Sequence, residues 1–499
     1  MLGQAVGESL QLPYINLSVS SPTKKEVLAI PETLAKEFRF VAFHIEPKKN
    51  LVKVATDSPK KKGLTYALQS AFPNMKIILY YALPADIDSA FVFYRRALTT
   101  SFAKILENNR RFAPEIITVI IEDAVLYRAS YIHFEPQEEE TIIRFRVDGV
   151  LQEAGRIQKE YYSNVVNRLK VQAHLRIDEH SRAQDGAIRM EVSNGQHVDL
   201  RLSLVPTLDG EKIVIRVLSE YVLEFTLAEL GLSTAASRAV QSAIEKPFGM
   251  VLVVGPTGSG KTTTLYTLLR MLNNPEVNLT TIEDPVEYKI KGINQIQVNN
   301  ATNLTFAAGL RSIVRQDPDV ILVGEIRDEE TAEIAVNAAL TGHMMLSTFH
   351  ANDSATAIPR LIEMGVEPFL LASTLEILVA QRLIRKLCEV CRVSNKKSAK
   401  ELNALLTKGA QVKLPALTVY EGKGCDNCNG SGYKGRIAVY EFIEVSSELE
   451  QLILEEPSAS QIWNLALKQG ATTLFSDGIE KVKQGVTTIE EVLRVAPPK

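Results

Sequence analysis

The stretch with the most specific chemistry runs from Gly255 to Thr262 and reads Gly-Pro-Thr-Gly-Ser-Gly-Lys-Thr. It matches the phosphate-binding loop pattern G-x-x-x-x-G-K-[ST], in which glycines allow backbone N–H groups to face a phosphate. Lys261 is expected to reach the β- and γ-phosphates of a nucleotide, and the Thr262 hydroxyl is expected to ligate Mg²⁺. A glycine-rich turn that matches by chance is the alternative. The residues predicted to contact the nucleotide are Gly255, Pro256, Thr257, Gly258, Ser259, Gly260, Lys261, Thr262 and Thr263.

The residues on either side of this loop predict the elements that hold it. Residues 250–254 form a short apolar run typical of a buried parallel strand, and residues 262–272 favour a helix. Further apolar runs at 280–282, 320–323 and 344–347 alternate with helical segments. This alternation predicts an α/β nucleotide domain, residues 239–385, with a parallel sheet covered by helices on both faces. The strand–loop–helix order argues against a chance match, so we expect the chain to bind a nucleoside triphosphate.

Two glutamates follow later strands of this domain. Glu283 ends the strand at 280–282, and Glu325 follows the strand at 320–323. Ligands of open α/β sheets lie at the carboxyl ends of the strands, where ATP hydrolysis needs one carboxylate to orient or activate water and another to help hold Mg²⁺. We assign Glu283 to the first role and Glu325 to the second, directly or through water. Gly324 stands where the usual magnesium-binding pattern has aspartate, and a solvated loop charge is the alternative for each glutamate.

Basic residues near these strands carry weaker signals. Arg311 and Arg315 are spaced i, i+4 and share a helical face, which suits a γ-phosphate or a subunit interface; a solvated ion pair is the plain alternative. His343 and His350 flank the strand at 344–347. Either histidine could sense the γ-phosphate or simply form a structural hydrogen bond, and the sequence favours neither interpretation.

The four cysteines of the chain lie in two Cys-x-x-Cys pairs, Cys388/Cys391 and Cys425/Cys428. Two such pairs form two thiolate knuckles that together complete a tetrahedral Zn²⁺ site, whereas a redox centre needs only one pair. We therefore predict a structural zinc that folds a protrusion with little core of its own, residues 386–440. Residues 441–499 read as a C-terminal helical region without assignable chemistry.

Two smaller units are predicted before the nucleotide domain. Residues 1–98 read as a small α/β unit without evident catalytic residues, either a docking or regulatory module or a structural appendage. Residues 99–222 read as an α+β, PAS-like unit with antiparallel strands and hairpin turns at Asp148-Gly149 and Asn194-Gly195; a linker follows at 223–238. Arginines recur in the second unit, where most are expected to be solvated: Arg176, Arg182, Arg189, Arg201 and Arg216.

Composition and length limit the remaining possibilities. The 499 residues favour roughly three domains, and 45% hydrophobic with 23% charged residues is the balance of a globular protein. A formal net charge of −3 gives no basic field for nucleic acid, which counts against a DNA-translocating motor. No apolar run approaches the length of a membrane span, and no secretory leader is evident, so we expect a cytoplasmic protein.

In the phosphate loop, the strand-end glutamates and the cysteine pairs, the chain resembles the secretion ATPase superfamily, and specifically its type II secretion and type IV pilus assembly (extension) ATPases. The stretches 255–264, 281–287, 315–328 and 341–350 match the family's Walker A, Asp, Walker B and His boxes, including its habitual Gly-Glu ending of Walker B. Upstream matches lie at 132–136, 144–150, 184–186, 198–201 and 210–216, so the likeness covers nearly the whole chain.

This resemblance implies a RecA-like P-loop NTPase domain in a homohexamer that hydrolyses ATP with Mg²⁺. Such a motor does mechanical work on an inner-membrane platform protein, with associated cytoplasmic assembly proteins, and feeds pilin subunits into a filament. Membrane contact would occur only through these partners, at the inner face of the cytoplasmic membrane. The resemblance also implies that Arg201, Arg216, Arg311 and Arg315 contact phosphates, that His350 is the retained histidine of the His box, and that the zinc insertion is of the extension type.

Departures from the family pattern limit what carries over. Tyr131 replaces a common aspartate, so any role of that aspartate is absent, and Phe349 and Ala351 replace leucine and threonine in the His box. An upstream arginine–glycine segment that binds a cyclic dinucleotide in relatives is missing, so that ligand is not expected. The rival reading is a nucleotide-gated assembly or regulatory scaffold that does no mechanical work. The two strand-end glutamates and the arginines argue against it.

Overall fold

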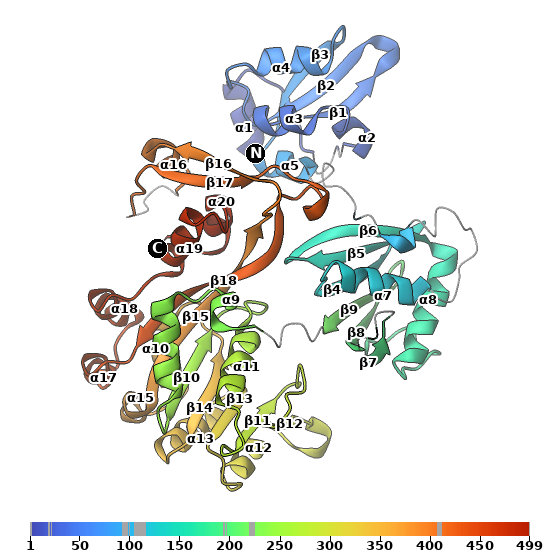
Figure 1. Ribbon diagram of the computed structural model, residues 1–499. Helices are drawn as coiled ribbons and strands as arrows, with labels where there is room; N and C mark the ends of the chain where they lie inside the picture. Colours follow the sequence, from blue (N-terminus) through green and yellow to red (C-terminus); the bar gives the residue numbers. More distant parts are fainter. Residues whose placement is uncertain are drawn as a thin grey trace. The chain divides into compact units, whose positions relative to one another are not determined.

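The computed structural model describes residues 2–498 apart from 18–19, 21, 92–97, 99, 104–115, 193–194, 196, 219–224 and 407–411. The chain divides into two compact units, Met1–Thr99 with Gln152–Gly155, and Thr100–Leu151 with Arg156–Lys499. The second unit carries the predicted antiparallel domain, the nucleotide domain, the cysteine pairs and the C-terminal helices (Figure 1). Among the described residues, no helix combines the length and the apolar character needed to cross a bilayer.

The first unit contains a three-stranded sheet with the order β1-β2-β3. β1 (Phe40–Glu46) and β2 (Leu51–Thr56) are antiparallel, whereas β2 and β3 (Lys76–Tyr81) are parallel because α4 (Leu64–Ala71) crosses between them. The remaining elements are α1 (Leu2–Ser9), α2 (Lys24–Val27), α3 (Glu32–Phe38), η1 (Pro47–Lys49) and α5 (Pro84–Ala90). The three strands and the helices α2, α3, α4 and α5 share an apolar core around Phe40, Val52 and Val54.

The antiparallel domain is built on a six-stranded sheet with the order β6-β5-β4-β9-β8-β7. Its strands are β4 (Tyr131–Pro136), β5 (Glu140–Val147), β6 (Val150–Gln158), β7 (Gln184–Glu191), β8 (His197–Thr207) and β9 (Gly210–Leu218). Alternate side chains of β4 and β5 are buried, and α7 (Ile116–Leu126) and α8 (Lys159–Gln172) contact these two strands. The predicted α+β architecture is confirmed. The predicted turn at Asp148-Gly149 joins β5 to β6, whereas Asn194 lies outside the described residues.

The nucleotide domain has a seven-stranded sheet with the order β12-β11-β13-β14-β10-β15-β18 (Figure 1). All neighbouring strands are parallel except β15 and β18, which are antiparallel. The strands are β10 (Gly249–Val254), β11 (Leu279–Glu283), β12 (Asn294–Gln297), β13 (Val320–Ile326), β14 (Met344–Phe349), β15 (Leu375–Leu387) and β18 (Tyr433–Glu444). The predicted parallel sheet is therefore confirmed.

Helices cover this sheet on both faces, as predicted. Met250, Leu252 and Val254 of β10 pack into one apolar cluster, whereas Val251 and Val253 pack into another, because successive side chains of a strand point to opposite faces. The first cluster includes residues of α12 (Phe306–Ile313), α13 (Glu329–Leu340), α14 (Ser354–Glu363) and α15 (Pro368–Thr374). The second includes residues of α11 (Lys261–Leu272), and the turn η4 (Asn300–Thr302) precedes α12.

Much of the segment that the sequence predicts as a linker, 223–238, is helical in the structure. Thr226 caps α9 (Leu227–Leu230) with a capping box, and Ser233 caps α10 (Thr234–Ile244). Leu227, Leu230 and Val240 are buried in the same cluster as β10 and α11. These leucines therefore belong to the core of the nucleotide domain, which begins earlier in the chain than residue 239.

The cysteine-bearing insertion leaves the sheet after β15 and returns to it through β18. Because β18 pairs with β15 over most of its length, residues 433–440 belong to the sheet as well as to the predicted insertion. The elements of the insertion are β16 (Arg392–Lys397), α16 (Ala399–Ala404), β17 (Leu417–Gly422) and η5 (Asp426–Cys428). The C-terminal helices follow β18 as predicted: α17 (Ser447–Ile453), α18 (Ala459–Lys468), α19 (Leu474–Lys483) and α20 (Ile489–Val495).

Candidate nucleotide and zinc sites

The phosphate loop lies between the end of β10 and the start of α11. Gly258 and Gly260 have φ angles of 79° and 89°, in the left-handed region that glycine adopts readily. A Cβ on Gly255 would lie 2.5 Å from the carbonyl oxygen of Gln381, so the close approach of β15 also requires glycine there. The loop therefore has the backbone form that turns N–H groups towards an anion at the N-terminus of a helix.

Lys261, the first residue of α11, is held by the loop that it follows. Its Nζ donates hydrogen bonds to the carbonyl oxygens of Gly255 at 2.9 Å and Pro256 at 3.3 Å. Burial lowers the pKa of Lys261, although the negative charge of Glu325 opposes that change. A phosphate would offer the ammonium group stronger, charged acceptors than these two carbonyls, so the donors present fit a nucleotide triphosphate.

Glu283 is a buried carboxylate at the end of β11, with only 3% of its surface exposed. Its Oε2 accepts a hydrogen bond of 2.5 Å from the Tyr266 hydroxyl, and its Oε1 accepts one of 2.6 Å from Thr281 Oγ1. Burial raises the pKa of Glu283 above its ordinary value, and these hydrogen bonds lower it in part. A raised pKa brings a carboxylate closer to the range in which it can take a proton from water near neutral pH.

Glu325 lies near the end of β13 and contacts two basic side chains. Its Oε2 lies 3.0 Å from His350 Nε2, and its Oε1 pairs with the Arg327 guanidinium at 2.5 Å. The structure thus brings together two residues that the sequence singled out separately, Glu325 and His350. A carboxylate oriented by a histidine can help to hold a cation, which would compete here with the Arg327 guanidinium for the same carboxylate.

The position of Gly324 explains the unusual end of the magnesium-binding pattern. A Cβ on Gly324 would lie 3.3 Å from the Cα of Glu283 and 3.3 Å from the carbonyl oxygen of Ile282. Thr348 Oγ1 also donates to the Gly324 carbonyl at 2.8 Å. An aspartate at this position would press against the strand that presents Glu283, so the close packing of β11 and β13 favours glycine there.

Two arginines of the antiparallel domain contact the loop that follows Glu283. Arg201 donates to the Val286 carbonyl at 2.6 Å, and Arg216 pairs with the Glu287 carboxylate at 2.6 Å. Arg201 also lies 3.6 Å from the same carboxylate. The antiparallel register places the two arginines opposite each other on β8 and β9. They therefore reach the edge of the nucleotide site as a pair, on a loop three to four residues beyond Glu283.

The other basic candidates have partners away from the phosphate loop. Arg311 pairs with Glu330, and Arg315 donates to the Arg311 carbonyl at 2.6 Å. His343 Nδ1 lies 2.8 Å from the Ala338 carbonyl at the end of α13, which agrees with the structural alternative for this histidine. None of the contacts given for the described part of the chain joins these three side chains to the phosphate loop.

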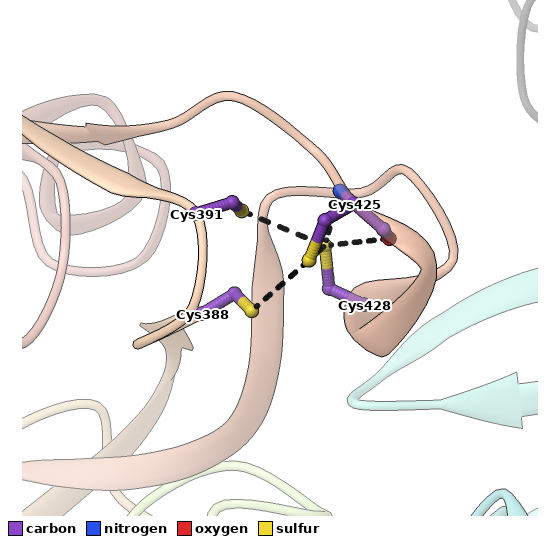
Figure 2. Close-up of side chains that lie close together, drawn as sticks. All are labelled: Cys388, Cys391, Cys425 and Cys428. Carbon is purple, nitrogen blue, oxygen red and sulfur yellow. Dashed lines mark hydrogen bonds between the residues drawn. The ribbon is translucent and has the colours of Figure 1, made fainter.

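The four cysteines converge on one point, as Figure 2 shows. The Sγ atoms of Cys388 and Cys425 are 3.8 Å apart, as are those of Cys391 and Cys428 and those of Cys425 and Cys428. All four Sγ atoms lie within 4.8 Å of one another. Four sulfurs bound tetrahedrally at a Zn–S distance of about 2.3 Å would be about 3.8 Å apart. The donor set and its spacing therefore fit a structural zinc ion.

The backbone around the cysteines supports the same assignment. The N–H groups of Cys425 and Gly432 point at Cys428 Sγ, at 3.2 and 3.3 Å. Burial would raise the pKa of the Cys388 thiol, but the backbone N–H groups of Val390 and Cys391 lower it to about 7. A Cβ on Gly422 would lie 2.2 Å from the Gly432 carbonyl oxygen, so the end of β17 and the segment before β18 approach too closely for a side chain there. The N–H groups that point at Cys388 favour its thiolate, the form that binds zinc, whereas burial and the neighbouring sulfurs raise the pKa of Cys391 and Cys425.

Several residues at the nucleotide site were missed by reasoning from the sequence. Tyr266 and Gln295 contact Glu283, Gln381 contacts the loop, and Arg327 pairs with Glu325. Tyr266 reads as an ordinary apolar position of α11, and Gln295 and Gln381 are ordinary strand residues. Only their spatial neighbours give them a role. Arg327, two residues after Glu325 in an acidic stretch, was the one with a sequence signal.

Comparison with known proteins places the chain in a family. The family described as "Type II/IV secretion system protein" matches residues 107–494. The type IV pilus assembly ATPase PilB of Thermus thermophilus is 38% identical over 99% of this chain, which spans 57% of that protein. Type II secretion system protein E of Pseudomonas aeruginosa is 45% identical over 76% of this chain and 74% of its own length.

A solved structure shares the fold. The ATPase DotB of Legionella pneumophila superposes with a TM-score of 0.58 at 20% identity, covering 77% of this chain and 96% of that one. At this identity the likeness concerns the fold, and it extends beyond the nucleotide domain alone. Since the family match covers most of the chain and the site geometry carries the family's four boxes, this protein belongs to the type II/IV secretion system ATPases.

Proposed function

We propose that this chain is a homohexameric motor that hydrolyses ATP to drive assembly of a type IV pilus or a type II secretion pseudopilus. The observation that supports it most directly is the buried carboxylate of Glu283, held against the helix that starts at the phosphate loop. A scaffold that only bound nucleotide would not need a carboxylate with a raised pKa at that place. The membership of the chain in a family of named ATPases supports the same reading.

Each residue of the site has a role in this proposal. The loop N–H groups and Lys261 bind the β- and γ-phosphates, and Thr262 with Glu325 would hold Mg²⁺, which neutralises phosphate charge during hydrolysis. Glu283 orients the attacking water and accepts its proton, which its buried position favours. His350 orients Glu325 through their 3.0 Å contact. Arg311 and Arg315 would contact phosphates only after leaving their present partners.

Arg201 and Arg216 supply the link to mechanical work. They now contact the loop at Val286 and Glu287, and ATP phosphates would compete with the Glu287 carboxylate for the same guanidinium groups. Movement of the antiparallel domain as the arginines exchange Glu287 for phosphate would be the power stroke. Arg216→Ala should bind ATP normally and turn it over more slowly. Undiminished turnover with normal binding would count against this coupling.

The enzymatic part is tested by steady-state hydrolysis with Mg²⁺. Wild type should turn over ATP slowly, Lys261→Ala should lose nucleotide binding, and Glu283→Gln should bind ATP with a turnover about 10²-fold or more lower. Glu276→Gln is the matched control, because Glu276 is an exposed glutamate of the same domain. Turnover that neither Lys261→Ala nor Glu283→Gln changes would refute the site.

The biological part needs an assembly assay. Filament formation or secretion in cells should fail with Glu283→Gln and persist with Glu276→Gln. Normal filament assembly with a hydrolysis-dead Glu283→Gln would instead favour a nucleotide-gated scaffold. Neighbouring genes would separate a pilus system from secretion or DNA uptake.

The partners and location follow from the same proposal. A hexamer would appear in native mass spectrometry as a complex of six chains. The motor would work at the inner face of the cytoplasmic membrane, joined to it only through a platform protein and associated assembly proteins. Co-purification with that platform protein, and stimulation of turnover by it, is the expected result. Salt-sensitive DNA binding would revive a DNA-translocating motor.

A further inference from the structure

We propose that Tyr266 is a positioning residue for Glu283, holding its carboxylate in the orientation in which it receives a proton from water. This inference rests on the proposed function, because it takes Glu283 as the general base. Tyr266 itself would not touch substrate. It acts through a hydrogen bond from the phosphate-loop helix to the end of the neighbouring strand.

The geometry fixes the Tyr266 hydroxyl in both of its hydrogen-bonding roles. Tyr266 lies on α11 with 2% of its surface exposed. Its hydroxyl donates to Glu283 Oε2 at 2.5 Å and accepts from the backbone N–H of Glu287 at 3.2 Å. A hydroxyl with one proton to donate, already given to Glu283, cannot rotate away without breaking that bond. The ring is held in addition by an edge contact with Tyr288.

The two oxygens of Glu283 are held by different donors. Oε1 accepts from Thr281 Oγ1 at 2.6 Å and lies 3.4 Å from Gln295 Nε2. Gln295 is fixed in turn, since its Nε2 donates to the Tyr288 carbonyl and its Oε1 accepts from the Ile290 N–H. Within the described residues, the side chain that donates a hydrogen bond to Oε2 is that of Tyr266. Loss of its hydroxyl would therefore free one carboxylate oxygen and leave the other held.

The electrostatics give this hydrogen bond a direction. Burial raises the pKa of Glu283, whereas the bonds from Thr281 and Tyr266 lower it. Burial and the charge of Glu283 raise the pKa of Tyr266, so the phenol stays protonated and remains a donor. Removal of the hydroxyl should thus raise the pKa of Glu283 further, because the charged carboxylate loses a donor.

The same hydroxyl connects Glu283 to the loop that the arginines contact. The backbone N–H of Glu287 donates a hydrogen bond to the Tyr266 hydroxyl, and the Glu287 carboxylate forms an ion pair with Arg216. A displacement of this loop when the arginines leave it would therefore change the hydrogen bond between Glu287 and the Tyr266 hydroxyl, which orients Glu283.

Tyr266→Phe tests the proposal, with turnover normalised to the chains that bind nucleotide so that misfolded protein does not count. We expect kcat to fall about tenfold while KM for ATP changes less than about twofold, because the base is misplaced but the phosphates are bound as before. The acidic limb of the kcat–pH profile should move to higher pH, because the charged carboxylate of Glu283 loses a hydrogen-bond donor. Unchanged kcat with an unchanged acidic limb would overturn the proposal.

Two further variants separate this role from structural loss and from failure of the base assignment. Tyr162→Phe removes another buried tyrosine hydroxyl, which donates to the Glu211 carbonyl at 2.6 Å in the antiparallel domain, and should leave the pH limb in place. Tyr266→Phe added to Glu283→Gln should cost no further turnover; an additional tenfold loss would show that Tyr266 acts through another group. Full activity of Glu283→Gln would overturn the base assignment itself, whereas an inactive Glu283→Gln beside a fully active Tyr266→Phe would overturn only the positioning role.

Discussion

Glu491 fastens the last helix of the chain to the strand that leads into the cysteine-bearing insertion. It lies on α20 with 1% of its surface exposed and accepts hydrogen bonds from the side chains of Arg385 and Arg494. Arg385 lies near the end of the long strand β15, ahead of Cys388, and its guanidinium lies 4.0 Å from the centre of the Tyr433 ring. The Tyr433 hydroxyl bonds Thr488 at 2.8 Å. Loss of the Glu491 charge should therefore loosen the base of the predicted zinc site.

The size of the effect follows from the carboxyl group. Burial by itself would raise the pKa of Glu491, but hydrogen bonds and charge from Arg494 and Arg385 lower it from 4.5 to about 2. A difference of about 2.5 between the unfolded and folded pKa corresponds to about 3 kcal/mol of stability. Because the folded pKa is the lower one, this stabilisation is full above about pH 4.5 and is lost as the pH falls towards 2.

Glu491→Gln measures the stability that the Glu491 charge contributes, and Glu490→Gln is the matched control on the same helix. Glu490 is half exposed and pairs with Lys397, so its neutralisation should cost at most about 1 kcal/mol. Since the chain has several domains, hydrogen exchange of peptides from β15 and α20 is a better readout than one global transition. At pH 7 the opening free energy of these peptides should be about 3 kcal/mol lower in Glu491→Gln than in wild type. This difference between the two proteins should become smaller below about pH 4.5. Equal exchange in both variants would refute the reasoning.

Three further predictions test other parts of the structure. Cys428→Ser should reduce bound zinc from about one per chain to none and expose the insertion to protease; four freely alkylated thiols in wild type without zinc would contradict the site. Gly324→Asp restores the usual magnesium-binding pattern but should lower thermal stability by about 1–3 kcal/mol and reduce turnover, because a side chain there meets the Glu283 backbone; a fully active variant would contradict this packing argument. Lys170→Met should destabilise the antiparallel domain by about 3–5 kcal/mol in thermal unfolding, since the buried Glu211 loses its ammonium partner at 2.8 Å, whereas the exposed Lys159→Met should change little.

The nucleotide fold was predictable because its signals are local. A buried strand, a glycine loop and a helix follow one another within residues 249–272. Later strands of the same domain also alternate with helices. The cluster of four cysteines was predictable for the same reason, since each half of it is a short Cys-x-x-Cys. The helices within 227–244 carry local signals as well, the N-caps Thr226 and Ser233, but their burial against β10 and α11 could not be predicted from those signals.

Pairing across long stretches of sequence could not be predicted in the same way. Thr264 on α11 bonds Gln381 on β15, and Ser354 on α14 bonds Glu441 on β18. Such contacts join elements that lie far apart in the sequence. The place of Arg201 and Arg216 was expected only through the family likeness, and their present partners, Val286 and Glu287, could not be read from any motif.

By itself, the sequence determined which groups can do chemistry: the phosphate loop, the two strand-end glutamates and the four thiols. Each of these motifs consists of residues that are close together in the sequence, so it can be recognised without the structure. Only the tertiary structure decided how those groups are tuned. It buried Glu283 against Tyr266, paired Glu325 with His350, and packed β11 closely against Gly324. Burial and hydrogen bonding between distant residues set the pKa and orientation of a carboxylate, and both exist only once the sheet and its helices are packed.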